Sequence, residues 1–254
     1  MESALKTGVL NLSDLKLNGK TAMWLELGTP GMVTKLKTLD LSGNNFKTIP
    51  IEVYGLINLK SLFLTSCSIQ YTNNMSNMVK LTKLKLDHND LEVDKIGTMP
   101  ESLNTLDLSF NHLNGLPAIL NGLTNLMYLD LSSNRIESLY GIDGLPGLVN
   151  LIMDDNLLME LPESICLLVK LKKLSLIRNR FIKNATTRSG QSIPVGLLEN
   201  TELDNIDLTG NVSISKADVM GFIGIEKFLQ RRQALKDKNF QGGALSDTTL
   251  FGLD

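Results

Sequence analysis

Any catalytic chemistry in this 254-residue chain would have to use Ser109, His88 and Asp87. These are the residue types of a nucleophile, a general base and the acid that orients the base. The only other histidine is His112, and no third ligand follows at a metal-binding spacing. No Gly-x-x-x-x-Gly-Lys loop, Gly-x-Ser-x-Gly elbow or Cys-x-x-Cys pair is present. We therefore expect no catalytic residues, no metal site and no cofactor, and interpret these side chains as parts of a repeated surface.

A hydrophobic pattern that returns every 22 or 23 residues determines where these side chains lie. In one block, Leu103, Leu106, Leu108, Asn111 and Leu113 stand at offsets 0, 3, 5, 8 and 10. Such a pattern predicts stacked repeats, in which each unit buries its leucines against its neighbours. The other blocks open at Leu36, Leu59, Leu81, Leu126, Leu148, Leu171 and Leu203.

Each block predicts a short strand followed by an asparagine turn. In the block that opens at Leu103, alternation sends Leu106 and Leu108 inward and sends Thr105, Asp107 and Ser109 outward. Successive strands then form one parallel sheet. The offset-8 asparagine can donate to and accept from the backbone of adjacent turns, and only Cys67 replaces it. These asparagines are Asn44, Asn89, Asn111, Asn134, Asn156, Asn179 and Asn211.

The complete fold expected is an α/β solenoid, a curved horseshoe with its parallel sheet on the concave face. The convex side is expected to hold short helical or extended segments, since proline steps such as Ile49-Pro50 disfavour long helices. We assign 1–35 to an N-terminal cap with a degenerate first repeat, and 36–213 to the repeats. Residues 214–240 should form a C-terminal capping helix. The remaining 241–254 are interpreted as a flexible tail that is either a docking peptide or disordered.

These residues resemble the intracellular leucine-rich repeat family, with its pattern LxxLxLxxNxL and a following Leu/Ile-Pro step, over about 7–213. Lys6–Val9, the long repeat near Ile193-Pro194 and the basic segment Lys227–Arg232 are similar to the small leucine-rich repeat-containing protein 57 type. The resemblance implies a non-catalytic protein-binding scaffold. The alternative it implies is a regulatory subunit or adaptor in a phosphatase or small GTPase pathway. Glu2 follows Met1, so N-myristoylation is not expected.

A partner polypeptide is expected to bind the concave sheet face. Apolar side chains stand there at positions that should meet water, beside an acidic band in the middle repeats. We predict that this face binds a segment with basic residues and an apolar anchor, although Leu-Asp-Leu is also an ordinary filler of such repeats. The predicted partner-binding residues are Phe63, Lys85, Asp87, His88, Asp107, Phe110, Tyr128, Asp130, Ile152, Asp154, Asp155, Ile177 and Arg178.

The terminal helix offers a second, basic surface. Arg231, Arg232, Lys236 and Lys238 could contact an acidic partner or an anionic membrane surface, while the competing interpretation is a cap over the last repeat. A formal net charge of −2 gives no general attraction to nucleic acid, so none is expected as a partner.

Cys67 and Cys166 lie in different repeats, roughly four strands apart at ~4.8 Å per strand. That separation exceeds the ~7 Å limit for bridged Cα atoms, so both should be free thiols, which suits a reducing compartment. The first residues lack the apolar run of a signal peptide, and no stretch approaches the ~18 apolar residues of a membrane span. We therefore expect a cytoplasmic protein with no membrane span.

Overall fold

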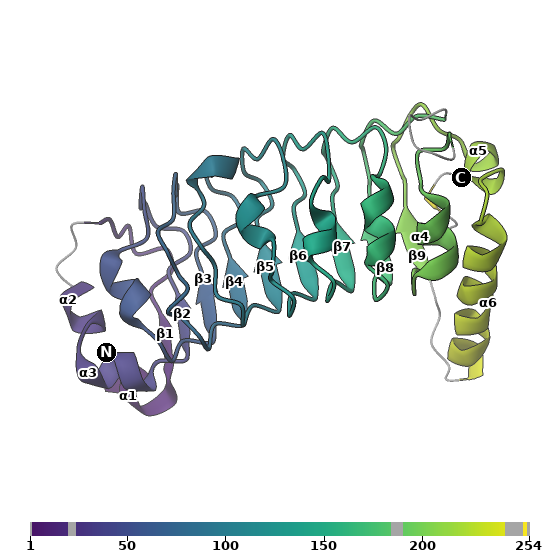
Figure 1. Cartoon of the computed structure of the whole chain (residues 1–254). Helices are drawn as coiled ribbons and strands as arrows, with labels where there is room; N and C mark the ends of the chain where they lie inside the picture. The colour runs from purple at the N-terminus through teal and green to yellow at the C-terminus, as the bar shows by residue number, and fades with distance from the viewer. Residues whose placement is uncertain (1, 20–23, 184–189, 242–250, 253–254) are drawn as a thin grey trace.

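Nine parallel strands lie side by side in chain order and form one sheet along an elongated molecule (Figure 1). The structure is a computed structural model that describes residues 2–19, 24–183, 190–241 and 251–252. The predicted solenoid with a parallel sheet is confirmed. The strands are β1 Val9–Asn11, β2 Thr38–Asp40, β3 Ser61–Phe63, β4 Lys83–Lys85, β5 Thr105–Asp107, β6 Tyr128–Asp130, β7 Asn150–Ile152, β8 Lys173–Ser175 and β9 Asn205–Asp207.

The strand register stacks equivalent residues of successive repeats directly beside one another. Leu84 pairs with Leu106, and Leu106 pairs with Leu129, so one leucine from each strand joins a continuous buried column. These central side chains are fully buried in the middle repeats. The core is therefore a row of leucines between neighbouring repeats, as the periodicity predicts.

The predicted asparagine ladder is confirmed by its hydrogen bonds. Asn111 Nδ2 donates to the carbonyl oxygens of Leu108 at 3.1 Å and Leu86 at 3.0 Å, while its Oδ1 accepts from Leu91 N–H at 3.0 Å. One amide thus satisfies backbone groups of two repeats that would otherwise be buried without partners. Where Cys67 replaces asparagine, its Sγ donates to Leu41 O at 3.1 Å.

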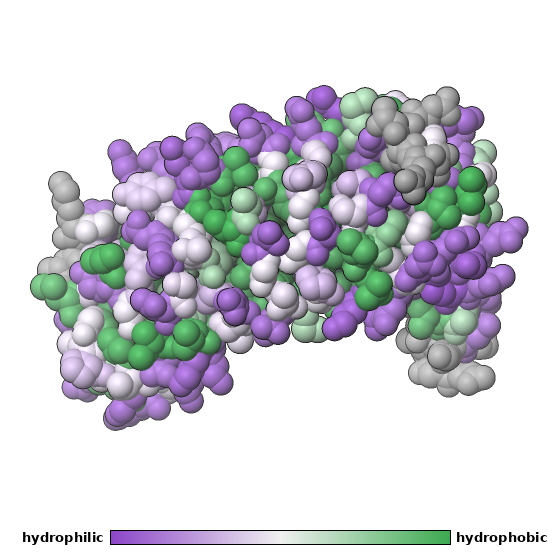
Figure 2. Space-filling view, in the orientation of Figure 1, coloured by the Kyte–Doolittle hydropathy of each residue, from purple (hydrophilic) through white to green (hydrophobic). Residues whose placement is uncertain are grey.

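The convex side carries short helices, and most of them are 3₁₀ turns. Pro50, Pro117 and Pro162 precede three of them, where the fixed φ of proline suits a helix start. In the space-filling view, hydrophobic patches over the middle of the stack are flanked by hydrophilic side chains along its long edges (Figure 2). The convex helices are η1 Ile51–Gly55, η2 Val93–Lys95, η3 Ala118–Leu120, η4 Ile142–Gly144, η5 Glu163–Leu167 and α4 Val195–Asn200.

Three short helices, α1 Glu2–Thr7, α2 Trp24–Leu27 and α3 Pro30–Lys35, lie at the N-terminal end of the stack (Figure 1). Trp24 packs edge-on against Phe46, with ring centroids 5.4 Å apart, and its indole N–H donates to Asn18 O at 2.9 Å. Only 3% of Trp24 is exposed. Its position fits a residue that covers the first repeats.

The predicted C-terminal capping helix is divided into α5 Lys216–Met220 and α6 Ile225–Gln241. Two glycines, Gly221 and Gly224, lie in the break, and Gly224 has a φ of +89° that a helix cannot contain. Ser215 and Asp218 form a capping box at the start of α5. The helical periodicity continues across the break, which explains why the sequence pattern alone suggests one helix.

Three residues of the predicted flexible tail are described: Gln241 ends α6, and Phe251 and Gly252 are docked on the end of the sheet. Leu208 N–H donates to Phe251 O at 2.8 Å, and the Phe251 ring stacks on Phe228 with centroids 5.6 Å apart. The interpretation of 241–254 as a tail leaves a docking peptide and a disordered end open, and these two residues make their contacts where an unpaired strand edge is available. The predicted tail positions 242–250 and 253–254 lie outside the described residues.

Candidate protein-interaction face

The residue at offset 7 of each repeat has a left-handed backbone, because the chain turns sharply as it leaves the strand. Two of these positions are glycine, the residue that adopts positive φ without cost. The others carry side chains, some of them large. The column contains Gly43, Ser66, His88, Phe110, Ser133, Asp155, Arg178 and Gly210, with φ between 50° and 75°.

Phe110 and His88 form an aromatic pair at the end of β4 and β5. Their rings stack with centroids 4.1 Å apart and an interplanar angle of 13°. His88 Nδ1 lies 3.1 Å from Asp87 Oδ2, which holds the imidazole against the phenyl ring. Phe110 is 49% exposed despite its strained backbone. An exposed aromatic side chain kept in a costly conformation is typical of a binding residue.

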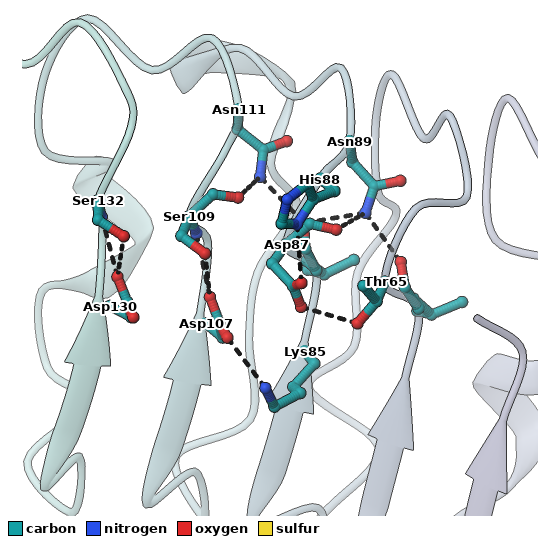
Figure 3. A network of polar contacts seen from close by, with 12 residues as sticks. Thr65, Lys85, Asp87, His88, Asn89, Asp107, Ser109, Asn111, Asp130 and Ser132 are labelled. Atoms are coloured by element: carbon teal, nitrogen blue, oxygen red, sulfur yellow. Dashed lines mark hydrogen bonds and ion pairs between the residues drawn. The ribbon is translucent and has the colours of Figure 1, made fainter. Parts of the chain in front are cut away.

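The concave aspartates are less exposed than the alternation alone predicts. Only 7% of Asp87 and 8% of Asp107 remain exposed, because neighbouring strands crowd their side chains together. Asp107 Oδ1 accepts from Ser109 Oγ at 2.7 Å, and Asp130 Oδ1 accepts from Ser132 Oγ at 2.7 Å (Figure 3). These carboxylates therefore hold the ends of their own strands.

Two aspartates instead connect neighbouring repeats. Asp87 accepts from Thr65 Oγ1 at 2.8 Å (Figure 3). Asp154 Oδ1 accepts from Ser175 Oγ at 2.6 Å and from Ile177 N–H at 2.9 Å. Both stand at offset 6, where the other repeats have serine or threonine except for Ile177. From this position the carboxylate contacts the neighbouring repeat rather than its own strand.

Positive partners are present for only some of the acidic side chains. Lys85 Nζ lies 3.2 Å from Asp107 Oδ2, and Arg178 forms a two-point contact with Asp155 at 2.5 Å. Within the described part of the chain, no ion pair reaches Asp130 or Asp154. The middle of the face therefore keeps an excess of negative charge.

Burial raises the pKa of the Asp130 and Asp154 carboxyls above the ordinary value, opposed by hydrogen bonds from Ser132 and Ser175 respectively. Nearby carboxylates also raise both pKa values. Burial, and then the charge of Asp130, raise the pKa of Tyr128 to about 12. A bound cation here would relieve the repulsion among these groups.

A hollow of about 350 Å³ lies on the sheet face across β6 to β9. The predicted residues Tyr128 and Ile152 line it, together with Lys173, Asn205 and Asp207. Lys173 and Asn205 were missed by the sequence reasoning, which followed offsets 4, 6 and 7. They share offset 2 with Tyr128, and following that column would have identified them.

The remaining apolar residues of the predicted site are partly covered. Phe63 is half-buried beneath Lys83, whose Nζ lies 5.4 Å from the ring centroid, and Ile177 is also half-buried. Of the apolar side chains predicted for this face, Phe110 is therefore the one that offers a large exposed contact.

The three residues of the conceivable catalytic group do not form a relay. Ser109 Oγ donates to Asp107, whereas His88 contacts Asp87. Across 2–19, 24–183, 190–241 and 251–252, no three His, Cys, Asp or Glu side chains gather where they could hold a metal ion. The geometry provides hydrogen bonds within each repeat rather than an activated nucleophile.

Arg231 of the predicted basic surface is used inside the molecule. Its guanidinium donates to Leu203 O at 3.0 Å and to Leu198 O at 2.5 Å, which fixes α6 against α4 and the last repeat. Burial lowers its pKa. Arg232 is half-buried, and the side chains of Lys236 and Lys238 lie outside what the structure describes.

This architecture defines a class of protein, the solenoid of short repeats with an exposed parallel sheet. A family model described as "Leucine rich repeat" matches residues 34–91 and 101–158. The fold is that of a leucine-rich repeat solenoid, and this family model matches just under half of the chain. None of the described helices has the length and hydrophobicity needed to cross a bilayer.

Known proteins of several kinds share this pattern. Osteomodulin of Bos taurus is 28% identical over 210 residues, which cover 79% of this chain and 47% of osteomodulin. A leucine-rich repeat protein of Leptospira interrogans has the same fold, with a TM-score of 0.64 at 22% identity over 87% of this chain and 60% of the other. The plant peptide hormone receptor RGFR1 in complex with RGF2 gives a TM-score of 0.51 at 25% identity, covering 79% and 35%. The chain spans between 12% and 47% of the length of its curated relatives.

Proposed function

We propose that this chain is a non-catalytic scaffold that binds a partner polypeptide on its concave sheet face. The observation that carries the proposal is Phe110, which is half exposed, stacked on His88 and held in a left-handed conformation. The other positions of this left-handed column carry glycine or a polar side chain, so Phe110 is its one large apolar side chain. The likeness to a peptide hormone receptor in complex with RGF2 supports the same function.

The partner segment is proposed to carry a basic residue beside an apolar anchor. Asp130 and Asp154 supply negative charge without an ion pair in the described residues, and Phe110 supplies the apolar contact. Opposite charges at such an interface mainly set specificity and the rate of association, while the aromatic contact contributes most of the affinity.

Combined replacement of Phe110 and Asp154 tests this function. Asp154→Asn removes the charge but keeps an oxygen for Ser175 and Ile177, so the repeats should remain intact. We expect Phe110→Ser with Asp154→Asn to reduce capture of the physiological partner at least about tenfold, with little change in the melting curve.

Tyr140→Ser is the matched control, because Tyr140 is 89% exposed and precedes η4 on the convex side. Capture that survives the Phe110 and Asp154 replacement, or that falls equally with Tyr140→Ser, would contradict a concave binding site.

A regulatory subunit or adaptor of a phosphatase or small GTPase pathway is the alternative form of the same proposal. Mass spectrometry of the partner retained by the wild-type chain and lost by the double variant separates this alternative from a free-standing scaffold.

We also propose a cytoplasmic location, on the ground that Cys67 and Cys166 are both free thiols. The similarity to the small leucine-rich repeat-containing protein 57 type is likewise proposed.

Arg231 does not contribute to the proposed basic surface of the terminal helix, because its guanidinium donates to backbone carbonyls inside the molecule. Charge reversal at Arg232, with binding to anionic vesicles measured against salt, tests what remains of it. Binding that ignores both salt and the reversal would exclude an electrostatic surface there.

A further inference from the structure

The last strand of the sheet is completed by a residue from the C-terminal segment. In the body of the sheet, an inward residue donates its N–H to the next strand, as when Leu176 N–H donates to Asp207 O at 2.8 Å. Among the residues that the structure describes, no tenth strand follows β9, yet Leu208 N–H donates to Phe251 O at the same distance. The Phe251 carbonyl therefore takes the acceptor position that a further strand would supply, although Phe251 itself lies in a turn with a φ of +63°.

The Phe251 side chain fills an aromatic pocket. It is 1% exposed and stacks on the fully buried Phe228 of α6, with an interplanar angle of 25°. α6 is held in place by the bonds from Arg231 to the last repeat, so the pocket is a fixed part of the cap. Burying a phenylalanine in this way contributes on the order of 2 kcal/mol, enough to offset part of the ordering of a short segment.

The next residue can only be glycine. Gly252 has a φ of +63°, and a Cβ at this position would collide with Thr209 Oγ1 and lie within contact of Asp207 Oδ1. Thr209 cannot easily move, because its hydroxyl donates to Asp207 Oδ1 at 2.6 Å. The backbone at this end of the sheet thus selects an aromatic residue followed by glycine.

We propose that the edge of β9, Phe228 and Thr209 form a docking site for a segment that contains a Phe-Gly pair in a left-handed turn, and that Phe251 and Gly252 of the same molecule are its occupant. Addition of a segment to a sheet edge is a common mode of peptide recognition, in which main-chain bonds give affinity and side-chain pockets give specificity. Here the carbonyl of Phe251 provides the main-chain bond, and Phe228 and Thr209 provide the specificity.

Amide hydrogen exchange at Leu208 in the full chain tests the proposal. We expect Leu208 N–H to be protected in the wild-type chain and to exchange at least about tenfold faster in both Phe251→Ala and Gly252→Ala. Leu176 N–H, which donates to Asp207, is the internal control and should not change. Gly252→Ala keeps the Phe251 ring, so it separates release of the segment from loss of a core residue.

A peptide with the sequence of residues 247–254 then tests the specificity. Added to the Gly252→Ala chain, it should restore protection of Leu208, whereas the same peptide with alanine in place of glycine should not. Unchanged exchange in both variants, or equal protection by the two peptides, would overturn the docking site. Contact between Leu208 of one isotope-labelled molecule and Phe251 of another would overturn occupancy within one molecule.

Discussion

Phe110 has a backbone conformation that works against folding, and we propose that its exposed ring serves binding. Its left-handed backbone costs roughly 1–2 kcal/mol relative to an ordinary conformation, and its ring is only half covered. Ser133 occupies the equivalent position in the next repeat with the same φ of 52°, but it carries a small polar side chain. The two positions therefore differ in what their side chains offer to a partner.

Phe110→Gly should leave the free energy of unfolding unchanged or raise it by up to about 1 kcal/mol, because glycine removes the backbone strain. The same change should reduce partner capture by about tenfold or more. Urea unfolding and a pull-down measure the two effects. Ser133→Gly is the control, with a similar stability but normal capture; loss of capture in both variants would attribute the effect to the turn rather than to the aromatic ring.

Burial raises the pKa of the Cys67 thiol to about 11, and carboxylates nearby add to the shift. Because this folded-state pKa lies above the ordinary value, the thiol contributes full stability below about pH 9, and that contribution is lost as the pH rises towards 11. At pH 8 we expect alkylation to modify only the half-buried Cys166 in the native chain, with Cys67 reacting after unfolding. Native Cys166→Ser should take up no label; rapid labelling of that variant would contradict a buried Cys67.

The sequence offsets predict which side chains share the concave face, but they cannot predict how exposed each one is. Asp107 and Phe110 are only three residues apart, yet one is buried and the other is half exposed. The difference arises from neighbours, since Lys85 and Ser109 cover Asp107. Such coverage depends on the side chains of adjacent repeats and on the curvature of the sheet, which periodicity does not contain.

At the scale of the element, the repeated turn depends on its asparagine ladder. Each ladder side chain joins the backbones of two repeats, so its loss leaves a buried N–H without an acceptor and removes donors from buried carbonyls.

Asn111→Ala should therefore lower the free energy of unfolding by about 3 kcal/mol, since the buried N–H of Leu91 loses its acceptor and the carbonyls of Leu86 and Leu108 each lose one of two amide donors. Asn114→Ala, three residues later and exposed, should change it by less than about 0.5 kcal/mol. Chemical denaturation compares the two variants. Equal losses would mean that the ladder adds no more than any surface asparagine.

The strands and the convex turns followed from spacing, whereas the break between α5 and α6 did not. A helical hydrophobic period describes which residues face inward, but it is insensitive to the conformation of Gly221 and Gly224 between them. The docking of Phe251 could not be predicted from the sequence pattern either. It pairs residues that are 43 positions apart (251 minus 208), and no repeat relates them.

At the scale of the whole molecule, the concave face behaves as one electrostatic surface. The carboxylates of Asp130 and Asp154 influence each other across adjacent strands, and burial raises the pKa of both. In the proposed complex, a basic partner side chain requires these groups to be ionised.

Partner affinity should accordingly fall as the pH drops through the raised pKa of these two carboxyls, at a pH above the ordinary value of 3.8. Affinity measured between pH 7 and pH 4 tests this. The variant with both Asp130→Asn and Asp154→Asn should bind weakly and show much less dependence on pH in that range. An unchanged pH profile in the variant would exclude these groups as the source.

A ladder of parallel strands has no built-in length, because every new strand offers the next one the same unpaired edge. The carbonyl that Phe251 presents to Leu208 terminates this series after nine strands. A chain that has lost this contact would have an unpaired edge at β9. A further molecule could bind there head to tail, and repeated binding would form a filament. The same small contact thus separates a self-limited particle from an open polymer.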